Sequence, residues 1–270
     1  MRWAFNITCL GSISVAAWFF YLMLFEPCRP SNAVSIPFHL LLFLTAYSLH
    51  LVSFVRTALT DPGKLPGEAV FSPSIENTCE RKRDGSFRYC RKCSLFKPDR
   101  AHHCQSCGRC TLRLDHCCVF IGNCIGQSNH KFFLLLLFWT SASGAIMGNA
   151  IWQIHGFYLS PERSSFLDLI VHGRQHIGVS FILAIVICLS LLIFFVFHIG
   201  IACFNITTIE LNEKRGIWPR SSYRNQFNVG LIRNLSSLLG RRPLLWLIPV
   251  VDRSAGSGIL WETSTSDKTQ

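Results

Sequence analysis

Residues 177–204 read IGVSFILAIVICLSLLIFFVFHIGIACF, a run of 28 residues without Asp, Glu, Lys or Arg. A helix needs about 20 apolar residues to cross the hydrocarbon core of a bilayer. Three more runs without such charges cover residues 7–25, 36–55 and 132–154. Half of the 270 residues are apolar and only 15% are charged, which is unusual for a soluble domain of this size. The sequence therefore predicts an α-helical integral membrane protein with four transmembrane helices.

The first of these runs has an alternative interpretation as a secretory signal, because Arg2 precedes it. At 19 residues, the run 7–25 is longer than a usual signal core. In addition, no cleavage site of small residues follows it. We therefore favour a true span.

The positive charges predict how the spans are oriented. The segment 56–131 contains 13 Lys and Arg residues and the tail after residue 204 contains nine, whereas the connections 26–35 and 155–176 contain one and two. Segments rich in Lys and Arg stay on the cytosolic side of a membrane. We therefore expect both basic segments and both termini in the cytosol. The net charge of +11 is then a signal of topology before it is a sign of nucleic-acid binding.

This topology divides the chain into four segments. Residues 1–59 contain the first two transmembrane helices, and residues 132–204 contain the third and fourth. A cytosolic cysteine-rich domain lies between spans two and three at 60–131, and a cytosolic tail follows at 205–270. Within the tail, apolar residues at near-helical spacing precede a run at 244–250 that is too short to cross a bilayer. We expect the tail to form a helix along the membrane surface.

Eight of the 13 cysteines lie between residues 90 and 124. In the reducing cytosol, clustered cysteines are typical of metal ligands or catalytic groups rather than of disulfides. Several are separated by two residues, which is the spacing of zinc knuckles. With three histidines the cluster offers eleven ligands, whereas two tetrahedral zinc ions need eight. A short, crossed arrangement predicts two structural zinc sites, the first formed by Cys90, Cys93, His103 and Cys110 and the second by Cys104, Cys107, Cys117 and Cys124.

Three potential ligands stay outside this arrangement, namely His102, His116 and Cys118. Spacing alone does not decide whether His102 or His103 binds the first zinc ion. If residues 115–118 are extended, their side chains alternate between the two faces of the strand. His116 and Cys118 then share one face, and Cys117 points to the other. Cys117 can then bind zinc, which ties up its negative charge and makes it a poor nucleophile.

The shared face brings a histidine beside a thiol that no zinc ion holds. The imidazole of His116 can take the proton of Cys118, and its positive form stabilises the thiolate. Asp115 can orient the imidazole and complete a relay of nucleophile, base and carboxylate. In the alternative interpretation, Cys118 is a spare cysteine of a purely structural zinc module. The position of the cluster, close to the third span, favours a nucleophile for a substrate with one apolar and one soluble end.

Three long stretches carry a specific pattern: RYCRKCSLFKPDRAHHCQSCGRC at 88–110, DHCC at 115–118 and NCIGQSNHKFF at 123–133. Shorter stretches accompany them, namely DPG at 61–63, TTIE at 207–210 and FNVGLIRN at 227–234. Together they resemble the DHHC-type protein S-acyltransferases, also called palmitoyltransferases. The resemblance covers all four spans and nearly the whole chain up to about residue 250.

The resemblance implies a two-step transfer of an acyl group. The donor is palmitoyl-CoA or another long-chain acyl-CoA, and the acceptors are cysteines of cytosolic or membrane proteins near the bilayer. By position, Cys118 is the nucleophile, His116 is the base and Asp115 orients it, while two zinc ions support the loop. The family implies an endomembrane location, the Golgi or the endoplasmic reticulum, with the plasma membrane as the alternative.

The chain departs from the family pattern at two places. Cys117 occupies the position of the signature's second histidine, which is a zinc ligand in the family, so one zinc ligand replaces another. A site of four thiolates carries one more negative charge than a site with an imidazole, which would raise the pKa of Cys118 and slow its attack. Val119 and Phe120 stand where the family usually has Pro-Trp. Both departures bear on the rate of the reaction.

Several other residues are expected to support the reaction. The phosphates of CoA need cationic contacts, for which Arg88, Lys97 and Arg100 are our candidates. These cations could instead offset the negative charge of the zinc-thiolate centres. Small residues at 141–148 could leave room for the fatty chain or allow close helix packing. The residues 207–210 are expected to dock the cysteine-rich domain onto the helices, or simply to cap a tail helix.

Competing classes of zinc protein fit less well. A ubiquitin-ligase RING needs longer cross-braced spacing and a final C-x2-C pair. A nucleic-acid-binding zinc finger needs a different ligand pattern, so we expect no nucleic-acid partner. The serious alternative is a catalytically weak relative that acts as a membrane scaffold or binds client proteins. The departures at 117 and 119–120 argue for it, whereas the intact Asp115, His116 and Cys118 argue for an active enzyme.

Overall fold

The computed structural model describes residues 2–25, 34–65, 78–82, 84–155, 175–214, 225–252 and 254–264. The connections 26–35 and 155–176, whose few charges supported the predicted orientation, lie almost wholly outside these residues. The chain forms two compact units, which we describe separately. The cysteine-rich unit consists of Met1–Phe5, Ser53–Leu134 and Phe197–Gln270, and the helical unit consists of Asn6–Val52 and Leu135–Val196.

Four long helices confirm the predicted spans: α1 (Arg2–Leu24), α3 (Ile36–Leu59), α5 (His130–His155) and α7 (Gln175–Cys203). All four are long and apolar enough to cross a membrane. The uncharged runs of the sequence form the body of each helix, because a backbone in hydrocarbon must satisfy its hydrogen bonds internally. Helix α3 continues for a further turn past its uncharged run to Leu59.

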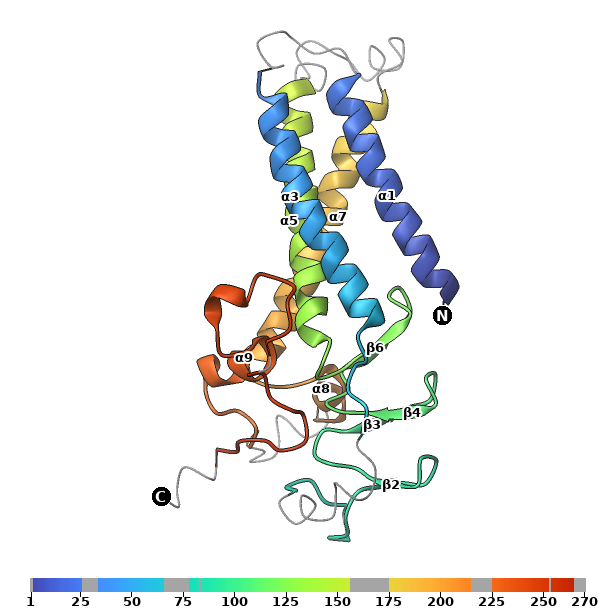
Figure 1. Ribbon diagram of the computed structural model, residues 1–270, viewed down its shortest axis with the longest axis vertical. Coiled ribbons are helices and arrows are strands. Elements are labelled where there is room, and N and C mark those ends of the chain that lie inside the picture. Colours follow the sequence, from blue (N-terminus) through green and yellow to red (C-terminus); the bar gives the residue numbers. More distant parts are fainter. Residues whose placement is uncertain are drawn as a thin grey trace. The chain divides into compact units, whose positions relative to one another are not determined.

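In the helical unit, the four helices run side by side and share one apolar core (Figure 1). The rings of Phe19 and Phe43 join α1 to α3 with centroids 4.3 Å apart. The hydroxyls of Ser141 and Ser143 donate to the carbonyls four residues earlier, so these polar groups are satisfied within α5. Outward-facing apolar side chains of α7, such as Ile193, are exposed, as expected for a helix face that lipid covers.

The small residues of α5 allow close packing against α7. A Cβ added to Gly144 would lie 3.2 Å from the Cβ of Cys188 and 3.4 Å from the carbonyl oxygen of Ala184. Gly144 also lines a cavity of about 230 Å³ within the helical unit, together with Ser143 and other residues of the four helices. Entry of a fatty chain into this space remains a prediction.

Within the described residues, the cysteine-rich unit contains three two-stranded antiparallel hairpins (Figure 1). They are β1 (Tyr89–Cys90) with β2 (Leu95–Phe96), β3 (His102–Cys104) with β4 (Arg109–Thr111), and β5 (His116–Cys118) with β6 (Asn123–Ile125). Hairpins this small bury little apolar surface, so they need further stabilisation from their surroundings. Cysteines of these hairpins gather in two compact clusters, described below.

The tail packs onto the cysteine-rich loop through α8 (Thr208–Lys214), α9 (Leu231–Leu239) and the 3₁₀ turn η2 (Pro243–Leu245). The side-chain amide of Gln127 donates to the carbonyls of Ser237 and Gly256. The segments expected at 60–131 and 205–270 therefore belong to one compact unit, together with the adjoining helix ends.

Candidate functional site

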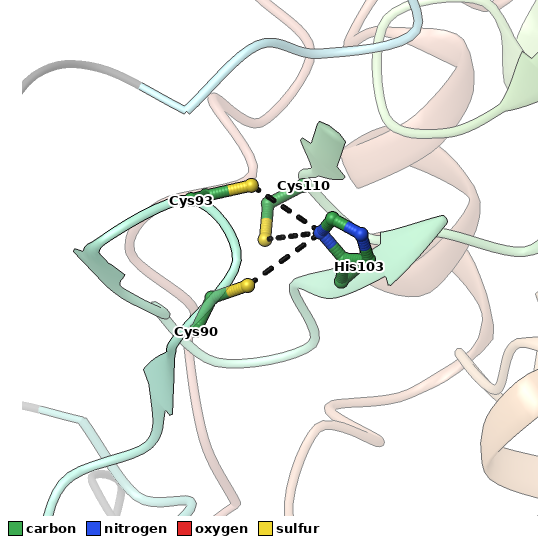
Figure 2. Close-up of side chains that lie close together, drawn as sticks. All are labelled: Cys90, Cys93, His103 and Cys110. Atoms are coloured by element: carbon green, nitrogen blue, oxygen red, sulfur yellow. Dashed lines mark hydrogen bonds between the residues drawn. The ribbon is translucent and has the colours of Figure 1, made fainter. Parts of the chain in front are cut away.

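The first candidate metal-binding cluster consists of Cys90, Cys93, His103 and Cys110 (Figure 2). Its four side chains converge because β1 supplies Cys90 and because the β3–β4 register pairs His103 with Cys110. The Nδ1 atom of His103 lies 3.5, 3.3 and 3.8 Å from the Sγ atoms of Cys90, Cys93 and Cys110. Ligand atoms of a tetrahedral zinc ion are about 3.5 to 3.8 Å apart, given its bond lengths. The donor set and its spacing therefore suit zinc.

The second cluster consists of Cys104, Cys107, Cys117 and Cys124, whose sulfur atoms all lie within 4.8 Å of one another. The β5–β6 register places Cys117 directly opposite Cys124. The Sγ of Cys107 is 3.1 Å from that of Cys124 and 3.9 Å from that of Cys117. Four soft thiol ligands in a compact group fit a structural zinc ion.

His102 lies apart from both clusters. It neighbours His103 on β3, where successive side chains alternate between the two faces. Its Nδ1 atom is 3.9 Å from a carboxylate oxygen of Glu213. Burial, followed by the nearby charge of Arg88, lowers the pKa of His102 to about 4. The cluster of possible ligands includes His103 and not His102.

The candidate catalytic residues lie at the start of the third hairpin. Asp115 is fully buried, and its Oδ2 atom is 2.7 Å from Nδ1 of His116. Its Oδ1 atom accepts the backbone N–H of Thr208 at 2.9 Å, and its backbone carbonyl accepts the hydroxyl of the same residue. His116 and Cys118 are two residues apart on β5, so they share a face. The structure thus brings together the three residues expected to form the relay.

The electrostatics of this group favour a thiolate beside an imidazolium. Burial would raise the pKa of Asp115, but its hydrogen bond with His116 and further nearby charges hold that pKa well below its usual range. Burial would lower the pKa of His116, but its interactions with Asp115 and Cys118 raise it to about 9. Burial would also raise the pKa of Cys118, yet hydrogen bonding with His116 and with backbone N–H groups lowers it. A lowered pKa increases the fraction of thiolate, which is the form that acts as a nucleophile.

The expected contact between Arg100 and CoA is not supported, because this side chain is completely buried. Its guanidinium forms two bonds to Glu210, at 2.7 and 3.0 Å, and a further bond to the side-chain oxygen of Asn205 at 2.7 Å. A buried charge needs such partners, so Arg100 has a structural role in joining the loop to the tail. These contacts and those of Thr208 fit the docking role expected for residues 207–210. Thr207 and Glu210 also bond to each other's backbone N–H groups at 3.2 and 2.9 Å, so the alternative role as a cap of α8 fits as well.

The other two candidate contacts for CoA differ in their surroundings. Arg88 pairs with Glu80 and donates to the carbonyl of Ala101 at 2.8 Å, and only 17% of its side chain is exposed. Lys97 is half-buried, at the end of the first hairpin.

Several residues of this site escape detection from sequence. Arg113 is buried beside Arg100 and donates to the same oxygen of Asn205 at 3.3 Å. The ring of Trp261 lies 4.4 Å from the guanidinium carbon of Arg100, on which it stacks. In a polar loop, an arginine that will be buried has the same sequence signature as one that stays in solvent. His198 of α7, whose position near Asp115 is described below, does attract notice in the sequence because histidines within apolar spans can be functional, but the sequence does not name its partner.

Comparison with known proteins identifies the relatives of this chain. Residues 84–215 match the family model described as DHHC palmitoyltransferase. The chain is 34% identical over 234 residues to probable protein S-acyltransferase 15 of Arabidopsis thaliana, covering 83% of this chain and 88% of the relative. It is 30% identical over 275 residues to palmitoyltransferase ZDHHC15 of Xenopus laevis, covering 92% and 78%. The chain therefore belongs to the DHHC palmitoyltransferase family.

Proposed function

We propose that this protein is an S-acyltransferase that moves a palmitoyl group from palmitoyl-CoA to cysteines of cytosolic and membrane proteins close to the bilayer. The observation that carries the proposal is the position of His116 between a buried carboxylate and a thiol. Its Nδ1 atom bonds to Asp115 at 2.7 Å, which leaves Nε2 for Cys118. Membership of the family supports the class of reaction.

The first half-reaction forms an acyl-enzyme. The Cys118 thiolate attacks the carbonyl carbon of the acyl-CoA thioester, so that a new S–C bond forms and the C–S bond to CoA breaks. The CoA sulfur leaves with the proton that His116 held. Asp115 keeps the imidazole in the tautomer with its proton on Nδ1.

The second half-reaction transfers the acyl group to a protein. Neutral His116 takes the proton of an incoming cysteine thiol, whose sulfur then attacks the acyl carbon. The bond to Cys118 breaks and restores its thiolate beside the imidazolium. The resting pair of charges is thus regenerated without any other reactant.

We propose two structural zinc ions, one in each cluster. When bound, zinc stabilises the small hairpins and holds its ligands as thiolates. Cys117, opposite Cys124 on the hairpin, would be such a ligand, which leaves Cys118 as the nucleophile. Of the cations expected to contact CoA, Lys97 and, to a lesser extent, Arg88 remain candidates for its phosphates.

The cellular setting follows from the charges and the family. We propose that the cysteine-rich loop and both termini face the cytosol, because Lys and Arg concentrate there. We propose the Golgi or the endoplasmic reticulum as the compartment, with the plasma membrane as the alternative. We keep the limits 1–59, 60–131, 132–204 and 205–270 as the proposed segments of the membrane topology.

Self-acylation tests the proposal directly. The purified protein in detergent would be incubated with labelled palmitoyl-CoA, and neutral hydroxylamine would test for a thioester. We expect label on the wild type and none on Cys118→Ser, with the zinc content unchanged. Cys117→Ser should lose zinc together with label. If folded, zinc-loaded wild type took up no label, the protein would be a catalytically weak scaffold instead. If the label were lost with Cys117→Ser while zinc was retained, Cys117 would be the nucleophile and the roles of the two cysteines would be reversed.

A further inference from the structure

His198 of α7 lies beside the candidate catalytic residues although it is 80 residues from Cys118 in sequence. Its side chain is 1% exposed. Its Nδ1 atom is 3.8 Å from Oδ2 of Asp115, the same oxygen that bonds to His116. This distance is longer than a hydrogen bond, but it places the ring nitrogen next to the buried carboxylate. Two imidazoles therefore face one carboxylate oxygen.

Two rings pack against the ring of His116. Its centroid lies 5.0 Å from that of Phe133 and 5.6 Å from that of His198. Phe133 and His198 also contact each other edge to face, with centroids 5.0 Å apart. The ring of His116 is thus confined by two neighbours, which restricts the rotamers it can adopt.

The surroundings of Asp115 explain what a second imidazole contributes. A buried carboxylate needs several donors, because removal from water is costly without them. His116 contacts Oδ2, and the backbone N–H of Thr208 contacts Oδ1. Behind them, Arg113 donates to Nδ1 of His130 at 3.1 Å, so this histidine accepts there and is neutral. His198 lies next to Oδ2, where it is a second possible donor to this carboxylate oxygen besides His116.

We propose that His198 is a positioning residue for acyl transfer, which holds the Asp115 carboxylate and the His116 ring in the geometry that activates Cys118. Its Nδ1–H would close the 3.8 Å gap to Oδ2 when the reaction changes the charge on His116, since catalytic hydrogen bonds often tighten only in the reacting complex. His198 touches neither the sulfur nor the substrate in this role. The inference rests on the proposed function of Cys118.

Substitutions of His198 that differ in where they place an N–H group test this role. His198→Asn keeps an N–H near the Nδ1 position, His198→Gln moves it outward, and His198→Leu removes it. The measurements are the single-turnover rate of Cys118 acylation and the KM for palmitoyl-CoA. Zinc content and melting temperature report on the fold, and Phe194→Leu, one turn earlier on α7, is the matched control.

We expect His198→Leu to lower the acylation rate about tenfold to a hundredfold, which is the range for residues that orient a functional histidine from behind. The KM, the zinc content and the Phe194→Leu control should stay within about twofold of wild type, if positioning alone is affected. His198→Asn should recover more of the rate than His198→Gln. Wild-type rates in His198→Leu, or equal rates in the Asn and Gln variants, would overturn the proposal. So would a loss that follows the melting temperature.

A second readout separates this inference from the proposed function. The rate at which iodoacetamide alkylates Cys118, mapped by mass spectrometry, depends on the thiolate and needs no acyl-CoA. A slower rate in His198→Leu, with recovery in His198→Asn, would support positioning even if the wild type failed to transfer palmitate. An unchanged alkylation rate in every variant would contradict it even if the wild type were an active acyltransferase.

Discussion

The two candidate metal-binding clusters each have four ligands, but their donors and their neighbours differ. The first offers three thiols and the imidazole of His103, whereas the second offers four thiols. With zinc bound, the second would carry one more negative charge than the first. Only the second has a ligand, Cys117, directly before the candidate nucleophile Cys118. Arg100, which ties the loop to Glu210 of the tail, lies in the sequence between two ligands of the first cluster, Cys93 and His103.

This difference suggests a division of roles within one unit. We expect the first cluster to stabilise the part of the loop onto which the tail docks. We expect the second cluster to stabilise the hairpin that carries His116 and Cys118. Its charge therefore bears on the reactivity of Cys118, whereas the charge of the first bears mainly on stability. The following variants separate the two roles.

Asp115→Asn should have the largest effect and should leave both clusters intact. The amide cannot hold His116 in the required tautomer, and the same change in a catalytic triad lowers the rate about 10⁴-fold. The measurement is the self-acylation rate, with zinc content as the control. A variant with near wild-type activity would remove Asp115 from the mechanism.

Arg100→Met should lower the stability of the cysteine-rich unit, because Arg100 joins the loop of the first cluster to the tail. The variant leaves Glu210, which is 2% exposed, without its charged partner, and breaking such a buried pair destabilises a protein by about 3 to 5 kcal/mol. Denaturant unfolding in detergent would measure the loss. The double variant Arg100→Met with Glu210→Leu should recover part of it, since no unpaired charge remains. Full stability in the single variant would contradict the docking role.

Cys117→His exchanges the donor set of the second cluster for that of the first. It removes one negative charge beside Cys118, so the pKa of this thiol should fall and its thiolate fraction near neutral pH should rise. If the pKa of Cys118 falls by one unit, the thiolate fraction rises up to about tenfold at a pH where the thiol is mostly protonated. The pH at which alkylation of Cys118 is half-maximal should therefore decrease. An unchanged midpoint, with two zinc ions per chain, would show that the extra charge is screened.

Arg109→Gln should have the smallest effect. Arg109 lies between the clusters on β4 and pairs with Asp61 at 2.7 Å, but 36% and 53% of the two side chains are exposed. Exposed pairs contribute at most about 1 kcal/mol. The free energy of unfolding and the acylation rate should both stay close to wild type. A loss similar to that of Arg100→Met would mean that this pair, rather than the buried one, holds the loop.

The sequence by itself determined the features that depend on neighbouring residues. A span needs a continuous apolar run, so four such runs were enough to predict four helices. The alternation of side chains along 115–118 predicted that His116 and Cys118 share a face, and β5 has this form. Spacing also predicted two groups of four ligands, and in the structure the four ligand atoms of each group lie close together. The zinc ions and the catalytic roles themselves remain proposals.

Only the tertiary structure decided which charges are buried and which distant residues meet. Arg88, Lys97 and Arg100 are alike as sequence, yet Arg100 alone is fully enclosed, because the tail supplies Glu210 and Asn205 as partners. His198 reaches Asp115 only because α7 and the third hairpin come together. Local patterns record the period of a helix or strand, whereas burial and long-range pairing depend on how the elements pack. For this reason the candidate nucleophile, its base and the carboxylate could be named from the sequence, but the burial of Arg100 and the contact of His198 with Asp115 could not.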